Sequence, residues 1–177
     1  QKKENYKKII ASVLLLVMAT CLNASARSTE PAHALINSYN LTDKLTPEAT
    51  EEAISNLSNT LALCTDNTMT SRIKYRIAMV YFKAGELKKA LSCFEKITQS
   101  AECPHMVKLC SFNMAGQIYR MQAKDDKALG AFEELIELSE TFAGKDPNQP
   151  TGTAVLKLAA TAGFSKAEIY RYNQNFD

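Results

Sequence analysis

The sequence lacks tryptophan, has only two histidines, and contains few glycines and prolines, six and five among 177 residues. So few glycines and prolines exclude a collagen-like or low-complexity chain. No apolar run reaches the roughly 20 residues that a membrane-spanning helix needs. The formal charge of +2 leaves no basic excess of the kind that nucleic-acid-binding proteins use to neutralise phosphates. We therefore expect no nucleic acid as partner.

Sequence motifs of catalysis are also missing. The chain has no Gly-rich phosphate loop, no G-x-S-x-G elbow and no H-E-x-x-H pair. The run Cys103-Pro104-His105, even with Cys110, matches no zinc-ligand spacing. Adjacent acids at 125–126 and 133–134 would diverge on a helix and could not converge on one substrate. We therefore predict a protein that is not an enzyme and that has no cofactor and no metal site.

The segment from Gln1 to Ala26 has the three parts of a secretory signal. A basic head (QKKENYKK) precedes an almost wholly apolar stretch (IIASVLLLVMATCL) and a small-residue exit that ends at Ala26. As a helix the apolar stretch would rise about 21 Å, short of the roughly 30 Å hydrocarbon core of a bilayer. We predict a cleaved signal peptide at residues 1–26 and a periplasmic or secreted protein, with an uncleaved anchor as one alternative.

The segment Met18-Ala19-Thr20-Cys21 gives a second alternative. It resembles the lipobox of bacterial lipoproteins, in which the cysteine is acylated and becomes the first mature residue. The usual leucine and small residue of that motif are replaced here by Met18 and Thr20. A membrane contact is thus expected only through an uncleaved signal or a lipidated Cys21.

An internal repeat, in which every position recurs at one constant offset, is the strongest pattern in the chain. Each copy has a small residue, then a tyrosine, then a turn residue, and finally an alanine followed by phenylalanine. The copies are Ala78, Tyr81, Gly85, Ala90 and Phe94, and then Gly116, Tyr119, Ala123, Ala128 and Phe132. Five matching positions in one register indicate two copies of one structural unit.

The spacing predicts an antiparallel helical hairpin in each copy. The small residues let two helix backbones approach, and Gly85 marks the tight turn because a left-handed backbone there has no Cβ penalty. Between residues 86 and 99, apolar side chains follow the 3/4 spacing of one buried stripe. Burying each large side chain contributes about 1.5–3 kcal/mol, so one hairpin is marginal against chain entropy and needs stacked neighbours.

This pattern resembles the tetratricopeptide repeat family over residues 72–99 and 110–138. The resemblance implies an all-α fold, a right-handed superhelix of stacked antiparallel helix pairs. The offset from Tyr81 to Tyr119 is longer than the family's usual period of about 34 residues, and the additional positions fall at 100–104. The resemblance also implies a scaffold that binds proteins without catalysing a reaction.

Two flanking segments look like degenerate copies. Upstream, Thr46 as cap and Pro47 as first residue predict a helix, whose expected partner at 31–42 is poor. Downstream, Ala167 and Tyr170 repeat the small-to-tyrosine spacing, and the sequence stops before a matching second helix, so we expect a fragment of a longer array. The predicted organisation after the signal is N-terminal helices at 27–66, two hairpins at 67–142, a loop at 143–152, and the first helix of a truncated repeat at 153–177.

In the tetratricopeptide repeat family the first helix of each hairpin lines the inner face of the superhelix. This face commonly holds a peptide or a helix of a partner protein. Counting from each tyrosine predicts the lining residues. They are Arg72, Tyr75, Met79, Phe82 and Lys83; Asn113, Gln117, Arg120 and Met121; and Phe164, Glu168, Arg171 and Tyr172. This mixed apolar and cationic surface suits an amphipathic helix or an extended apolar segment, with Arg120 and Arg171 available for acidic groups.

The sequence leaves two questions open, the role of the inner-face side chains and the state of the cysteines, and it disfavours one mode of binding. The inner-face side chains could instead be core residues that other segments cover. Tyr75 and Met79 replace the lysine and asparagine of the subclass that grips a C-terminal carboxylate, which disfavours that mode of binding. The four cysteines after the signal could be free thiols, or Cys103 could bridge to Cys93 or Cys64 in an oxidising compartment.

The sequence thus predicts a scaffold of the bacterial cell envelope that binds a protein or peptide on its inner face. The alternatives are the N-terminal repeat region of a larger secreted enzyme or sensor, or a lipoprotein of an envelope-assembly complex.

Overall fold

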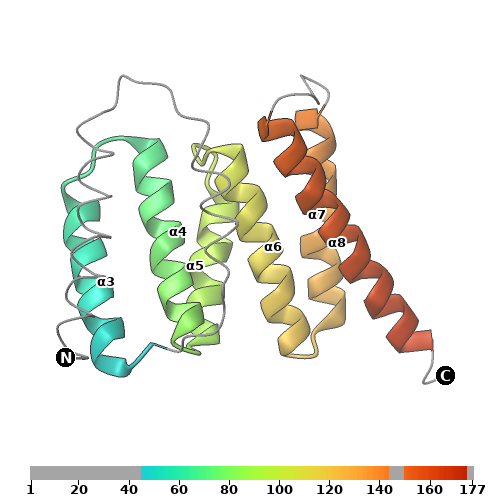
Figure 1. Ribbon diagram of the computed structural model, residues 1–177, viewed down its shortest axis with the longest axis horizontal. Helices are drawn as coiled ribbons and strands as arrows, with labels where there is room; N and C mark the ends of the chain where they lie inside the picture. The colour runs from blue at the N-terminus through green and yellow to red at the C-terminus, as the bar shows by residue number, and fades with distance from the viewer. Residues whose placement is uncertain (1–44, 144–149, 175–177) are drawn as a thin grey trace.

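The computed structural model describes residues 45–143 and 150–174, and these residues form α-helices and their connections without any strand. The helices are α3 (Pro47–Ala62), α4 (Asn67–Lys83), α5 (Leu87–Gln99), α6 (His105–Met121), α7 (Asp125–Ala143) and α8 (Pro150–Gln174). Figure 1 shows them in a row that begins with α3 (cyan) and ends with α7 and α8 (orange and red). The predicted signal peptide, Cys21 and the segment 31–42 lie outside the described residues.

Each helix packs mainly against its neighbours in the sequence, and α6 also contacts α4 and α8. Consecutive helices joined by short turns run antiparallel, so α4 with α5 and α6 with α7 form two hairpins, as Figure 1 shows. The predicted all-α architecture of stacked helix pairs is confirmed. None of the helices in the described ranges is both long and apolar enough to span a bilayer.

Side-chain caps fix the starts of the first two helices. The Thr46 hydroxyl accepts a hydrogen bond from the Ala49 N–H at 3.2 Å, and Pro47 occupies the first turn. The Asp66 carboxylate accepts from the Met69 N–H at 2.6 Å and begins α4. Such caps satisfy N–H groups that have no partner within the helix.

The turns of the two hairpins share a left-handed residue at equivalent positions. Gly85 has φ 79° between α4 and α5, and its equivalent in the second copy, Ala123, has φ 54° between α6 and α7. The repeat therefore reproduces the turn backbone even where alanine replaces glycine. At Ala123 the Cβ makes this conformation about 1–2 kcal/mol less favourable than it is for glycine.

The repeated small and aromatic residues form the centre of the core. Ala78, Ala90, Phe94, Ala128 and Phe132 are completely buried. A Cβ placed on Gly116 would lie 2.5 Å from Cε1 of Phe132. Glycine is therefore required at that position because the aromatic ring of α7 fills the space above it.

Helix α8 differs from the sequence prediction in two ways. It begins at Pro150 and α7 extends through Ala143, so the predicted loop 143–152 is shorter at its C-terminal end. Ala167 and Tyr170, predicted to have the structural role of Gly116 and Tyr119, are exposed. A different set of α8 side chains is buried instead: Ala154, Val155, Leu158, Ala162, Ser165 and Ile169. The described residues contain no second helix that covers Ala167, which is the physical reason for its exposure.

Candidate protein-binding surface

Helices α4, α6 and α8 line the inner face that the sequence predicts. These first helices touch one another, with α6 between α4 and α8, whereas the second helices α5 and α7 make no comparable contact within the described ranges. In a curved stack the elements on the concave side lie closer together. The candidate surface is therefore the side formed by α4, α6 and α8.

The structure divides the thirteen predicted inner-face residues by exposure. Tyr75, Met79 and Asn113 are buried; Arg72, Phe82, Lys83, Gln117, Arg120 and Glu168 are half-buried; Met121, Phe164, Arg171 and Tyr172 are exposed. Tyr75 is only 1% exposed, and its ring meets that of Phe94 edge to face at 5.5 Å. Tyr75 and Met79 are thus core residues, and their predicted role in contacting a partner is corrected.

Asn113 lies at the centre of α6 and keeps an unused hydrogen-bonding group. Its side-chain Oδ1 is buried, and it is the one such side-chain atom in the described ranges without a hydrogen-bond partner. An unsatisfied buried carbonyl oxygen costs about 1–3 kcal/mol. This amide oxygen can accept one hydrogen bond from a donor that reaches it.

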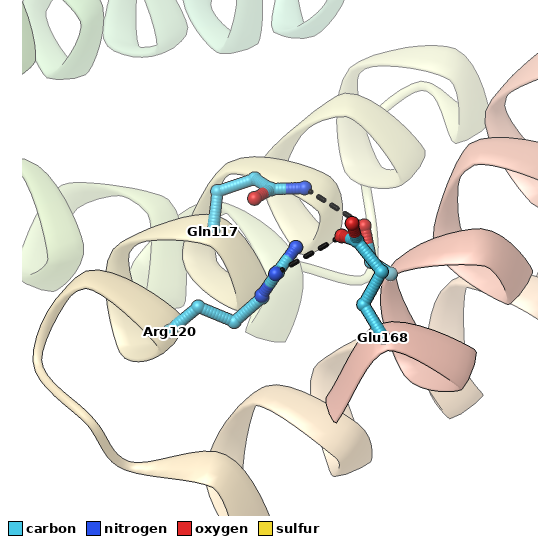
Figure 2. Close-up of polar contacts among 4 residues, drawn as sticks. Gln117, Arg120 and Glu168 are labelled. Carbon is cyan, nitrogen blue, oxygen red and sulfur yellow. Dashed lines mark hydrogen bonds and ion pairs between the residues drawn. The ribbon is translucent and has the colours of Figure 1, made fainter. Parts of the chain in front are cut away.

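Polar side chains connect α6 to α8 across the inner face. Figure 2 shows Gln117 and Arg120 of α6 pointing toward Glu168 of α8. The Arg120 guanidinium lies 3.1 Å from the Glu168 carboxylate, and the Gln117 amide donates to the Ser165 hydroxyl at 3.2 Å. Arg120, which the sequence offered to acidic groups of a partner, is therefore already neutralised. At about one-third exposure, this ion pair contributes at most about 1 kcal/mol.

Helix α4 carries several cationic side chains. It contains Arg72, Lys74, Arg76 and Lys83 and no acidic residue, and none of these cations has an ion pair within the described ranges. Burial, and then the charge of Arg72, lower the pKa of Arg76 below its ordinary value. Two guanidinium groups four residues apart on one helix face repel each other, so an acidic group placed between them would be favoured.

The sequence prediction missed Arg76 and Ser165. Arg76 could have been found from its spacing, because residues i and i+4 share a helix face and Arg72 was already assigned to this surface. Ser165 gave no such signal, since its partner Gln117 is 48 residues away in the chain.

One further hydrogen bond joins the two repeats away from α8. The Tyr119 hydroxyl of α6 donates to the Glu95 carboxylate of α5. Burial and this hydrogen bond together raise the pKa of Tyr119 to about 12. The repeated tyrosine therefore contributes to the contact between hairpins.

Four cysteines and His105 lie within the described ranges. All four cysteines in the described ranges, Cys64, Cys93, Cys103 and Cys110, are free. Burial raises the pKa of the Cys110 thiol to about 12, so this thiol stays protonated at neutral pH. The His105 ring packs 4.3 Å from that of Phe142, and no group of three or more potential metal ligands occurs in these ranges.

Comparison with known proteins agrees with this geometry. Residues 69–141, which include α5 and α6 whole and nearly all of α4 and α7, match the family model described as Tetratricopeptide repeat. No curated protein and no solved structure matches the chain. The predicted family is confirmed over residues 69–141, which form tetratricopeptide repeats, and such repeats generally act as protein–protein interaction scaffolds.

Proposed function

We propose that this protein is a non-enzymatic scaffold of the bacterial cell envelope that holds a partner protein or peptide on the face formed by α4, α6 and α8. Membership of the tetratricopeptide repeat family supports the general role in protein binding. The observation that carries the proposal is the contrast along this face. Within the part of the chain that the structure describes, Arg72, Arg76 and Lys83 of α4 have no acidic partner, whereas Arg120 of α6 is paired with Glu168.

The favoured partner is an amphipathic helix or an extended apolar segment that carries acidic side chains. Half-buried Phe82 offers apolar contact beside the cations of α4. Exposed Met121 and Tyr172 extend the apolar surface toward the other end of the row.

Charge reversal on α4 tests this proposal. The double variant Arg72→Glu, Lys83→Glu should lose at least one protein captured by the wild-type chain from a periplasmic extract after chemical cross-linking and mass spectrometry. The matched control is Lys88→Glu, Lys96→Glu, which makes the same change in net charge on exposed positions of α5. Circular dichroism should show equal helicity in all three proteins. Identical partner sets in the two variants would contradict the proposed role of α4.

Export is a separate part of the proposal, supported by the pattern of residues 1–26. Mass spectrometry of the mature protein should give an N-terminus at Arg27. An acylated Cys21 would instead favour an envelope lipoprotein, and retention of residues 1–26 would favour an uncleaved anchor.

A further inference from the structure

Helix α8 has apolar side chains on two opposite faces. One face is covered by α7 and contains Val155, Leu158, Ala162 and Ile169. The other, which we call the outer face of α8, consists of Leu156, Ala160, Gly163, Ala167 and Tyr170, which follow the alternating four-and-three spacing of one helix stripe. A helix that is apolar on opposite sides is typical of positions between two layers.

The outer face of α8 is open to solvent. Leu156 and Tyr170 are 46% and 48% exposed, and a Cβ built on Gly163 would meet no atom within 4 Å. Phe164, which borders this face, is 66% exposed. Four of the six large hydrophobic side chains exposed in the described ranges lie on this single helix. Exposed apolar surface concentrated in this way marks an interaction site.

The charges that border this face favour an acidic partner. Lys157 and Arg171 lie beside the outer face, are exposed, and have no ion pair within the described ranges. The other two charged residues of α8 form ion pairs within the protein. Glu168 pairs with Arg120, and Lys166 pairs with Glu133. The free rim of the outer face is therefore purely cationic.

The same charges disfavour a second copy of this chain as the occupant. Lys157 and Arg171 lie at equal distances along the chain on either side of Phe164. An antiparallel pair of α8 helices centred there would place Lys157 of one copy beside Arg171 of the other. Like charges at such positions destabilise a helix pair, whereas an acidic helix would neutralise both cations.

We propose that the outer face of α8 docks an acidic amphipathic helix of a partner protein. The small residues at its centre let the helix backbone approach closely, and Leu156, Phe164 and Tyr170 pack around it. Three exposed side chains correspond to an interface at the small, reversible end of the usual range. This site lies on a different side of α8 from its contact with α6 and does not depend on binding at α4.

Helix α7 supplies a probe of the required chemistry. Helix α7 packs against α6 at Gly116, three residues before Tyr119. Helix α8 repeats this spacing at Ala167 and Tyr170. The sequence of α7 has six acidic residues and one lysine. A synthetic peptide of residues 125–143 therefore combines a suitable apolar stripe with acidic flanks.

The experiment measures fluorescence anisotropy of this labelled peptide titrated with the full chain. We expect saturable binding that Ala167→Glu weakens at least tenfold, since it places a carboxylate in the centre of the contact. Tyr170→Glu, at a second exposed position, should have a similar effect. Lys96→Glu on α5 is the control and should leave binding unchanged, and circular dichroism should show that all variants stay folded.

A second peptide tests the charge requirement. Replacing Glu133, Glu134, Glu137 and Glu140 of the peptide by glutamine should weaken binding at least threefold at low salt. Equal binding by wild-type and Ala167→Glu chains would overturn the proposed site, and absence of binding by the acidic peptide would overturn the proposed partner. Self-association of the wild-type chain in sedimentation that Ala167→Glu abolishes would overturn the proposed partner too, because it would show that a second copy is the occupant.

Discussion

Helices α6 and α8 carry the same small-to-tyrosine spacing but have different surroundings. In α6, Gly116 lies under the Phe132 ring of α7, and Tyr119 donates a hydrogen bond to Glu95 of α5. In α8, Ala167 and Tyr170 are exposed. The repeat pattern therefore specifies a face that can be covered by a helix, whereas burial depends on whether such a helix is present. Substitutions of like residues in a covered and in an open setting test this difference.

The largest contrast should come from the aromatic residues Phe132 and Phe164. Phe132 is completely buried, so Phe132→Ala should lower the free energy of unfolding by about 3–5 kcal/mol. Phe164 is exposed, so Phe164→Ala should change it by no more than about 0.5 kcal/mol. Urea denaturation followed by circular dichroism measures both. A large loss for Phe164→Ala would mean that this side chain is covered in solution.

The same substitution at two helical glycines should have opposite effects. Gly116→Ala should destabilise the fold by about 1–2 kcal/mol, because overpacking against Phe132 exceeds the gain in helix propensity. Gly163→Ala should stabilise it by about 0.5–1 kcal/mol, since the added Cβ meets open space. Thermal and urea unfolding of both variants gives the signs directly. A destabilising Gly163→Ala would contradict an open outer face of α8.

The two tyrosines should differ in hydrogen bonding and in pH dependence. Tyr119→Phe should cost about 1 kcal/mol through loss of the bond to Glu95, whereas exposed Tyr170→Phe should cost almost nothing. The pKa of Tyr119 is raised from 10 to about 12 in the folded protein, so the native state holds the proton more tightly than the unfolded state. The stabilisation is fully present below pH 10 and is lost between pH 10 and 12.

Comparing wild type with Tyr119→Phe isolates this pH effect from the titration of lysines. The difference in unfolding free energy between the two proteins should shrink as the pH rises from 10 to 12. A difference that does not change over this interval would show that Tyr119 titrates alike in both states.

The smallest effect concerns the turn of the second hairpin. Ala123→Gly should stabilise the protein by about 0.5–1 kcal/mol, because relief of the left-handed conformation exceeds the added entropy of the unfolded chain. Gly85→Ala, in the equivalent turn of the first hairpin, should have the opposite sign. Equal and small changes in both turns would show that the left-handed backbone is not maintained in solution.

The sequence alone predicted the helix pairs and their register, because small residues and the aromatic residues that pack beside them recur at a fixed offset. It could not decide which inner-face residues are accessible. Tyr75 follows the same counting rule as Arg72, yet only three-dimensional packing places its ring against Phe94. Ion pairs such as Arg120 with Glu168 depend on the angle at which two helices cross, which local sequence does not contain.

The same limit explains the outcome at the C-terminal end of the described chain. The spacing of Ala167 and Tyr170 was recognisable, but the exposure of a helix face is set by the element packed against it. Sequence similarity between copies therefore predicts that a face is suited to pack against a helix. It does not predict whether a helix covers that face.

Contacts restricted mainly to neighbouring helices also have a mechanical consequence. In a stack of this kind each helix is held in place mainly by the helices next to it. Under tension applied across the described helices, the terminal helices α3 and α8 should detach before the inner hairpins open, so the array should lengthen in separate steps.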